Sequence, residues 1–80
     1  MGHGRGGGFK MPLTIAPIGK ELTVRKIAVD EKLKKHLESL GITINSKITI
    51  LSQNGGNLIC LIKDGRLALD KNTAVKIFVY

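Results

Sequence analysis

Two glycine-bearing turns constrain the fold of this chain more than any other feature of the sequence. Asn54-Gly55-Gly56 and Asp64-Gly65 separate three short segments that are rich in apolar residues, namely SKITIL, NLICLIK and RLALD. Glycine readily adopts the positive φ angles that tight β-hairpin turns require. The pattern therefore predicts three consecutive strands joined by hairpins.

Further strands are predicted on both sides of these hairpins. Residues 21–28, ELTVRKIA, alternate apolar and polar side chains, and AVKIFVY at residues 74–80 repeats this period of two. A short strand is also expected at residues 13–15, followed by a tight loop at residues 17–19.

One helix is predicted between the second and third of these strands. Asp30 can cap its N-terminus, and Leu33, Leu37 and Leu40 recur at i, i+4 and i+7 on one face. Gly41 suits the left-handed residue that often ends a helix. A helix of about three turns is not stable alone in water, so we expect the leucine stripe to pack on the sheet.

These elements predict a mainly β fold, a small barrel of five to six strands with one α-helix inserted after the second strand. Closure into a barrel protects edge strands from unwanted pairing. NLICLIK is apolar on both faces, so we expect the helix to cover its outer face. Residues 12–80 would form this single domain, because a chain of 80 residues is long enough to build only one hydrophobic core. Residues 1–11, rich in glycine, would form a flexible tail.

The charge and the single cysteine restrict location and partners. No apolar run is long enough to insert in a membrane, and one cysteine excludes an internal disulfide, so we expect a cytoplasmic protein. The formal net charge of +7 favours an acidic partner, which could be a nucleic acid, an anionic membrane surface or an acidic protein face. Strand edges left open by imperfect closure could also pair between copies of the chain.

The sequence offers no recognisable catalytic group, so we expect no enzymatic activity. Cys60 lies in the middle of an apolar strand and is predicted to be a buried, inert thiol. One cysteine and two histidines are too few for a closed zinc site, and we expect no metal and no cofactor. A weak contact between Fe²⁺ or another divalent ion and His36, with Glu31 or Glu38, stays open.

Nucleic-acid binding is the first alternative. Lys32, Lys34 and Lys35 form a basic run on the predicted helix. However, the aromatic residues are few and lie near the chain ends, so the sequence predicts no platform for stacking bases. The sequence therefore argues against nucleic acid as a partner.

The run LESLGITINSKITIL, followed by GGNLICLIKDGRLALDKNTAVKIFV, resembles the FeoA family over residues 12–79. Ile44-Asn45 stands where the family usually has Pro-Gly, and asparagine is the residue best able to replace glycine in a left-handed turn. The family's helix, turn and strand positions fall on Leu37, Leu40, Gly41, Ile42, Ile48, Ile50, Gly65, Leu69, Ala74, Ile77 and Val79.

The resemblance implies an SH3-like barrel without enzymatic activity. It also implies a cytosolic accessory protein of bacterial ferrous iron uptake, which docks on FeoB, the membrane iron transporter with a cytosolic GTP-binding domain, and supports or regulates it. The outer helix face and the adjacent turns would be free to meet this partner. We expect Lys34, Lys35 and Glu38, with Leu37 at the edge of the leucine stripe, to contribute to the contact.

The same barrel resembles the C-terminal domain of iron-dependent repressors. A metalloregulator-like domain is therefore a further alternative. Nothing in the sequence resembles the DNA-binding or dimerisation helices of those repressors.

Overall fold

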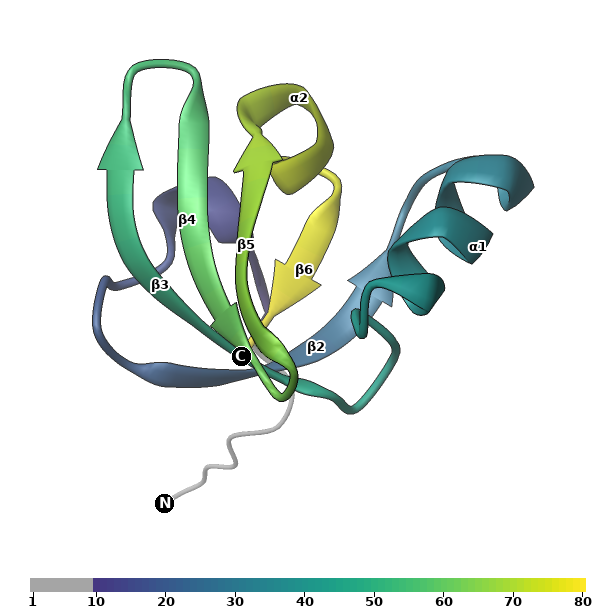
Figure 1. Cartoon of the computed structure of the whole chain (residues 1–80), viewed down its shortest axis with the longest axis horizontal. Coiled ribbons are helices and arrows are strands. Elements are labelled where there is room, and N and C mark those ends of the chain that lie inside the picture. The colour runs from purple at the N-terminus through teal and green to yellow at the C-terminus, as the bar shows by residue number, and fades with distance from the viewer. Residues whose placement is uncertain (1–9) are drawn as a thin grey trace.

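The computed structural model describes residues 10–80, which form one six-stranded antiparallel sheet in the order β1-β6-β2-β3-β4-β5 (Figure 1). Most of the predicted tail lies outside the described residues. The elements are β1 (Met11–Pro12), the 3₁₀ turn η2 (Leu13–Ile15), β2 (Glu21–Ile27), α1 (Glu31–Ser39), β3 (Lys47–Asn54), β4 (Asn57–Ile62), β5 (Gly65–Asp70), α2 (Lys71–Ala74) and β6 (Ile77–Val79).

The predicted hairpins are confirmed. β3, β4 and β5 pair in sequence order. Each hairpin turn has two residues between its closing pair, which is Asn54 and Asn57 in the first hairpin and Ile62 and Gly65 in the second. Gly55 and Gly65 have the positive φ angles that the sequence predicts, +55° and +133°. Glycine is needed here because other residues are strained at such angles.

Register irregularities help the sheet to curve. One lies in β2 between Val24 and Lys26, and another lies in β3 between Ile50 and Ser52. An extra residue of this kind bends its strand and increases the local twist. The strands consequently curve, as Figure 1 shows, and they enclose one apolar core.

The predicted start and end of α1 are confirmed. The Asp30 carboxylate accepts a hydrogen bond of 2.9 Å from the Leu33 N–H. At the other end, Gly41 has φ +101° and donates to the Glu38 carbonyl at 3.0 Å, while Ile42 donates to the Leu37 carbonyl at 2.9 Å. This pair of bonds is the Schellman motif, which satisfies the last carbonyl groups of a helix.

Two predicted strands are partly wrong. Residues 13–15 form a 3₁₀ turn, because this turn brings both Leu13 and Ala16, three residues apart, into the core. The C-terminal strand begins only at Ile77, because Asp70 caps a short helix, α2, that the sequence analysis missed. The Asp70 carboxylate accepts a hydrogen bond of 3.2 Å from the Thr73 N–H.

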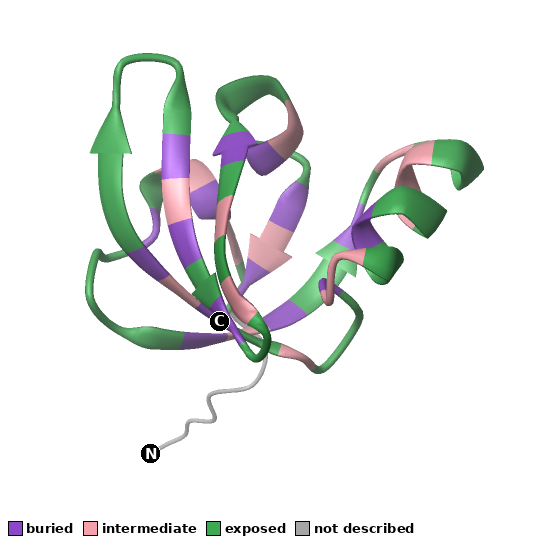
Figure 2. Ribbon diagram, in the orientation of Figure 1, coloured by how far each residue is buried: buried purple, intermediate pink, exposed green. Residues whose placement is uncertain are grey.

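The position of α1 also differs from the prediction. Leu37 is buried in the core and Leu33 packs against it, but α1 projects beside the end of β2 and does not cover the outer face of β4. Figure 2 shows that most of α1 is exposed. The outer face of β4 is left with Ile59 half-buried and Leu61 44% exposed. No helix in residues 10–80 has the length and hydropathy needed to cross a bilayer.

Candidate docking surface

Cys60 is buried in β4, with 0% of its surface exposed, so the prediction of a buried thiol is confirmed. Burial raises the pKa of this thiol to about 11, because the charged thiolate would lose its hydration in the core. A thiol that stays protonated is a poor nucleophile.

We expect Cys60 to react with a thiol reagent at pH 8 only when the chain unfolds.

Because the folded pKa lies above the unfolded value of 9.0, this group lowers the unfolding free energy as pH rises from about 9 toward 11. The measurement is denaturant unfolding at several pH values, compared with Cys60→Ala, which lacks the titrating thiol. An equal fall in both proteins above pH 9 would contradict this role of Cys60.

The other candidate reactive groups do not come together. His36 is exposed in the last turn of α1, whereas Cys60 is in the core. Within residues 10–80, no three side chains of the histidine, cysteine, aspartate and glutamate types are grouped so that they could hold a metal ion.

The predicted contact residues of α1 occupy three different environments. Lys35 and Glu38 are exposed, as expected for an outer helix face, and Lys34 is half-buried. Leu37 is only 1% exposed, so its expected place at the edge of the surface is wrong. The leucine stripe of α1 faces the core, where Leu37 and Ile42 are both buried.

A groove lies next to the C-terminal end of α1. Its volume is about 520 Å³, and it runs between the loop from α1 to β3 and the turn from β4 to β5. Leu61 and Ile62 supply its apolar part. The full lining is Glu21, Gly41, Thr43, Asn45, Ser46, Lys47, Thr49, Leu61, Ile62, Lys63 and Asp64.

The loop that forms one wall of the groove is held by a compact set of hydrogen bonds. The Ser46 hydroxyl donates to the Thr43 carbonyl at 2.7 Å and accepts from the Thr43 N–H at 3.1 Å. Asn45 has φ +74°, as the sequence analysis predicts for this turn, and its N–H donates to the Val24 carbonyl at 2.8 Å. The loop is thereby fixed to β2 and gives the groove a preformed wall.

Gly41 sets the spacing between the helix end and the opposite wall. A Cβ at this position would lie 3.3 Å from Cδ1 of Ile62 and 3.7 Å from Oδ2 of Asp64. The positive φ angle and this close approach both favour glycine.

The sequence analysis did not identify this groove, although one signal pointed to it. A strand that is apolar on both faces needs cover on both, and α1 leaves Leu61 uncovered. The lining of the groove also includes charges of both signs, from Glu21, Lys47, Lys63 and Asp64. Apolar side chains beside polar and charged ones are the usual composition of a protein interface.

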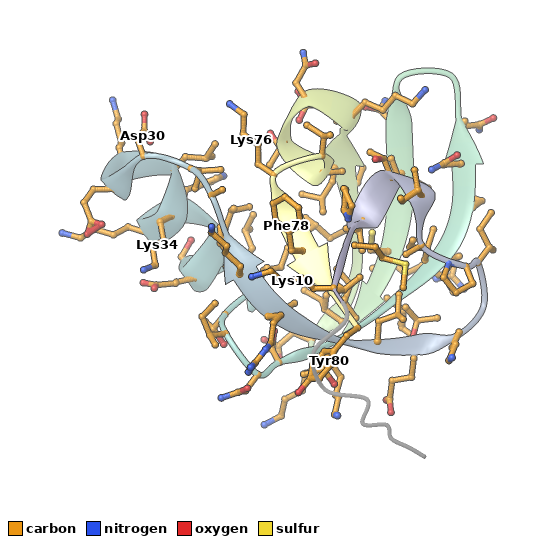
Figure 3. The ribbon with its side chains drawn as sticks, turned by 180° about the vertical axis from the view of Figure 1, so that it is seen from behind. Lys10, Asp30, Lys34, Lys76, Phe78 and Tyr80 are labelled. Atoms are coloured by element: carbon orange, nitrogen blue, oxygen red, sulfur yellow. The ribbon has the colours of Figure 1, made fainter. Side chains whose placement is uncertain are left out.

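A second surface lies where the strands near the chain ends meet (Figure 3). The Arg25 guanidinium lies 5.3 Å from the centre of the Tyr80 ring, and Phe78 pairs with Lys26 across β6 and β2. Phe78 is half-buried and Tyr80 is 38% exposed. The fold thus places two aromatic side chains beside basic ones, which their positions in the sequence did not suggest.

Comparison with known proteins shows the family of this chain. The model of the FeoA domain matches residues 11–80. A protein of Methanocaldococcus jannaschii named "Putative Fe(2+) transport protein A" is 34% identical over 68 residues, which is 85% of this chain and 83% of that protein.

Solved structures show the same fold. A crystal structure of an iron uptake regulatory protein, FeoA, has a TM-score of 0.79 and 25% identity, and the match covers 90% of this chain and 96% of that one. A manganese-dependent transcriptional repressor has a TM-score of 0.82 and 23% identity, over 89% of this chain but 40% of the repressor. The predicted mainly β, SH3-like barrel is confirmed.

Proposed function

Because the chain belongs to the FeoA domain family, we propose that it is a cytoplasmic accessory protein of ferrous iron uptake that docks on a FeoB-type transporter. The partner would be the cytosolic, GTP-binding part of that transporter, and docking would support or regulate transport. The observation that carries the proposal is the family match, which extends over residues 11–80, the whole barrel.

The surface of the barrel supports a binding role. The one cysteine of the chain is buried with a raised pKa, whereas α1 and the neighbouring groove offer exposed charge beside apolar surface. A protein partner needs this combination, since apolar contact supplies affinity and charge supplies orientation and encounter rate.

We assign the docking surface to α1 and the adjoining groove. It comprises Lys34, Lys35 and Glu38 on the helix and Leu61 in the lining of the groove. Leu37 supports this surface from inside, since it is buried beneath α1. The lysines would meet acidic groups of the transporter, as the basic charge of the chain favours.

Charge reversal at Lys34 and Lys35 tests this surface. In the double variant Lys34→Glu/Lys35→Glu we expect binding to the transporter's GTP-binding domain to weaken by about tenfold or more, because attraction to acidic groups becomes repulsion. Isothermal titration calorimetry of the two purified proteins measures the affinity.

The matched control is Lys10→Glu/Lys71→Glu, which makes the same charge change at exposed positions that neither belong to α1 nor line the groove. Unchanged affinity in the α1 variant would remove the helix from the docking surface. An equal loss in both variants would show that net charge, rather than this surface, governs binding.

Nucleic-acid binding is tested on the same samples. The aromatic and basic face around Tyr80 is the observation that favours this alternative. Retention on mixed DNA or RNA that falls steeply with salt concentration would support it, whereas no retention in dilute buffer would exclude it.

A further inference from the structure

β5 leaves one long strand edge of the sheet without a strand beside it. The strand order of residues 10–80 ends with β1 on one side and β5 on the other. β1 has only two residues, one of which is Pro12, whereas β5 has six. Only β5 therefore offers an edge long enough for another strand to pair with.

The hairpin register determines which main-chain groups face this edge. Ile62 and Gly65 close the turn from β4 to β5, and a closing pair of a two-residue hairpin exchanges both of its hydrogen bonds. Every second pair repeats this pattern, so the N–H and C=O groups of Arg66, Ala68 and Asp70 point away from β4. In the described part of the chain, no hydrogen bond from outside the strands reaches the main chain of Arg66 or Ala68.

The side chains of the same three residues are exposed. They form the order basic, small and acidic along the strand, with Ala68 in the middle. If two copies of β5 pair antiparallel with Ala68 opposite Ala68, Arg66 of each copy lies opposite Asp70 of the other. Opposite charges at directly opposed positions stabilise a strand pair, and the small alanine permits close approach at the centre.

We propose that β5 is a dimerisation strand, which pairs antiparallel with β5 of a second copy of this chain around a two-fold axis at Ala68. The register turns outward the main-chain groups of Arg66 and Ala68 and the N–H of Asp70, which this pairing uses, whereas the Asp70 carbonyl belongs to the first turn of α2. The charge pattern is self-complementary in the same register, so two independent features of the strand specify one partner.

The pairing closes on itself. Each copy uses its single long edge. The edge at β1 cannot pair with a further copy, because β1 has only two residues and one of them is Pro12. The product is a dimer with a continuous sheet rather than a fibre. It goes beyond docking on the transporter, because none of the docking residues on α1 belongs to β5.

The test measures self-association by analytical ultracentrifugation from about 10 μM to about 1 mM, a range suited to a small interface. We expect the mass of the native chain to rise from 8.7 kDa toward twice that value. Arg66→Asp places like charges opposite each other at two positions of the dimer, so we expect association to weaken by about tenfold or more. Asp70→Lys should have the same effect.

An equimolar mixture of the Arg66→Asp and Asp70→Lys variants is the decisive sample. Each variant repels itself, but the mixture restores opposite charges at both positions, so we expect a heterodimer with about the native affinity. Addition of a strand from another kind of protein would need no such complementarity within the chain.

Lys26→Asp is the matched control, since it makes the same type of charge change on an exposed residue of β2. Asp70→Lys also removes the cap of α2, so amide NMR spectra must show that this variant is folded. If Asp70→Lys is not folded, the test is the comparison of Arg66→Asp with Lys26→Asp, because Arg66→Asp removes no helix cap. A native mass that stays at 8.7 kDa at about 1 mM, equal association of the Arg66→Asp and Lys26→Asp variants, or a folded mixture that remains monomeric would overturn the proposal.

Discussion

Leu37→Ala is expected to lower the unfolding free energy by about 2–5 kcal/mol, the range for removing most of a fully buried leucine side chain. Leu37 is 1% exposed and lies where α1 joins the core, next to Ile42 at the helix end. A loss of this size is a large part of the stability of a small domain. Urea unfolding followed by circular dichroism measures it.

Leu33→Ala is the control, because Leu33 is on the same helix but half-buried. We expect it to cost about 1 kcal/mol, in proportion to the smaller apolar area that it buries. Equal losses in the two variants would contradict the packing of α1. Loss of transporter binding by Leu37→Ala at unchanged stability would instead restore Leu37 as a contact residue.

Leu61→Glu is expected to weaken binding to the transporter's GTP-binding domain by about thirtyfold or more, the effect of losing a central apolar contact of about 2 kcal/mol. Leu61 is 44% exposed and lines the groove, so a partner that fills the groove would cover it. Because the side chain is already partly in water, the fold should persist. Calorimetric titration gives the affinity, and thermal unfolding shows whether the variant is folded.

The same substitution at Leu51 is the control. Leu51 is 36% exposed in β3 but does not line the groove. We expect Leu51→Glu to leave the affinity within about twofold of the native value, because scattered exposed apolar residues carry little binding energy. Similar losses at both positions would mean that binding does not depend on the groove.

The hairpins and α1 could be predicted because their signals are local. Glycine turns, a period of two and a capping aspartate act within a few residues, and the structure has each of them where the sequence places it. Asn45 is a further case, since its positive φ angle follows from the chemistry of a single residue.

The parts that could not be predicted depend on tertiary contacts. α2 has only four residues, too few for a periodic pattern, and its cap at Asp70 looks like the end of a strand in the sequence. The direction in which α1 leaves the sheet is set by packing at Leu37 and Ile42. The sequence therefore could not show that α1 would leave the outer face of β4 uncovered. The groove results from this direction and was missed for the same reason.

The position of β6 has a consequence for how the chain folds. β6 pairs with β1 and β2, with Val79 opposite both Met11 and Val24, although β3, β4 and β5 lie between these segments in the sequence. The entropy of closing so long a loop must be lost before this pairing contributes any stability. We therefore expect the central hairpins to form before the two chain ends pair, because the contacts of the hairpins are closer in the sequence.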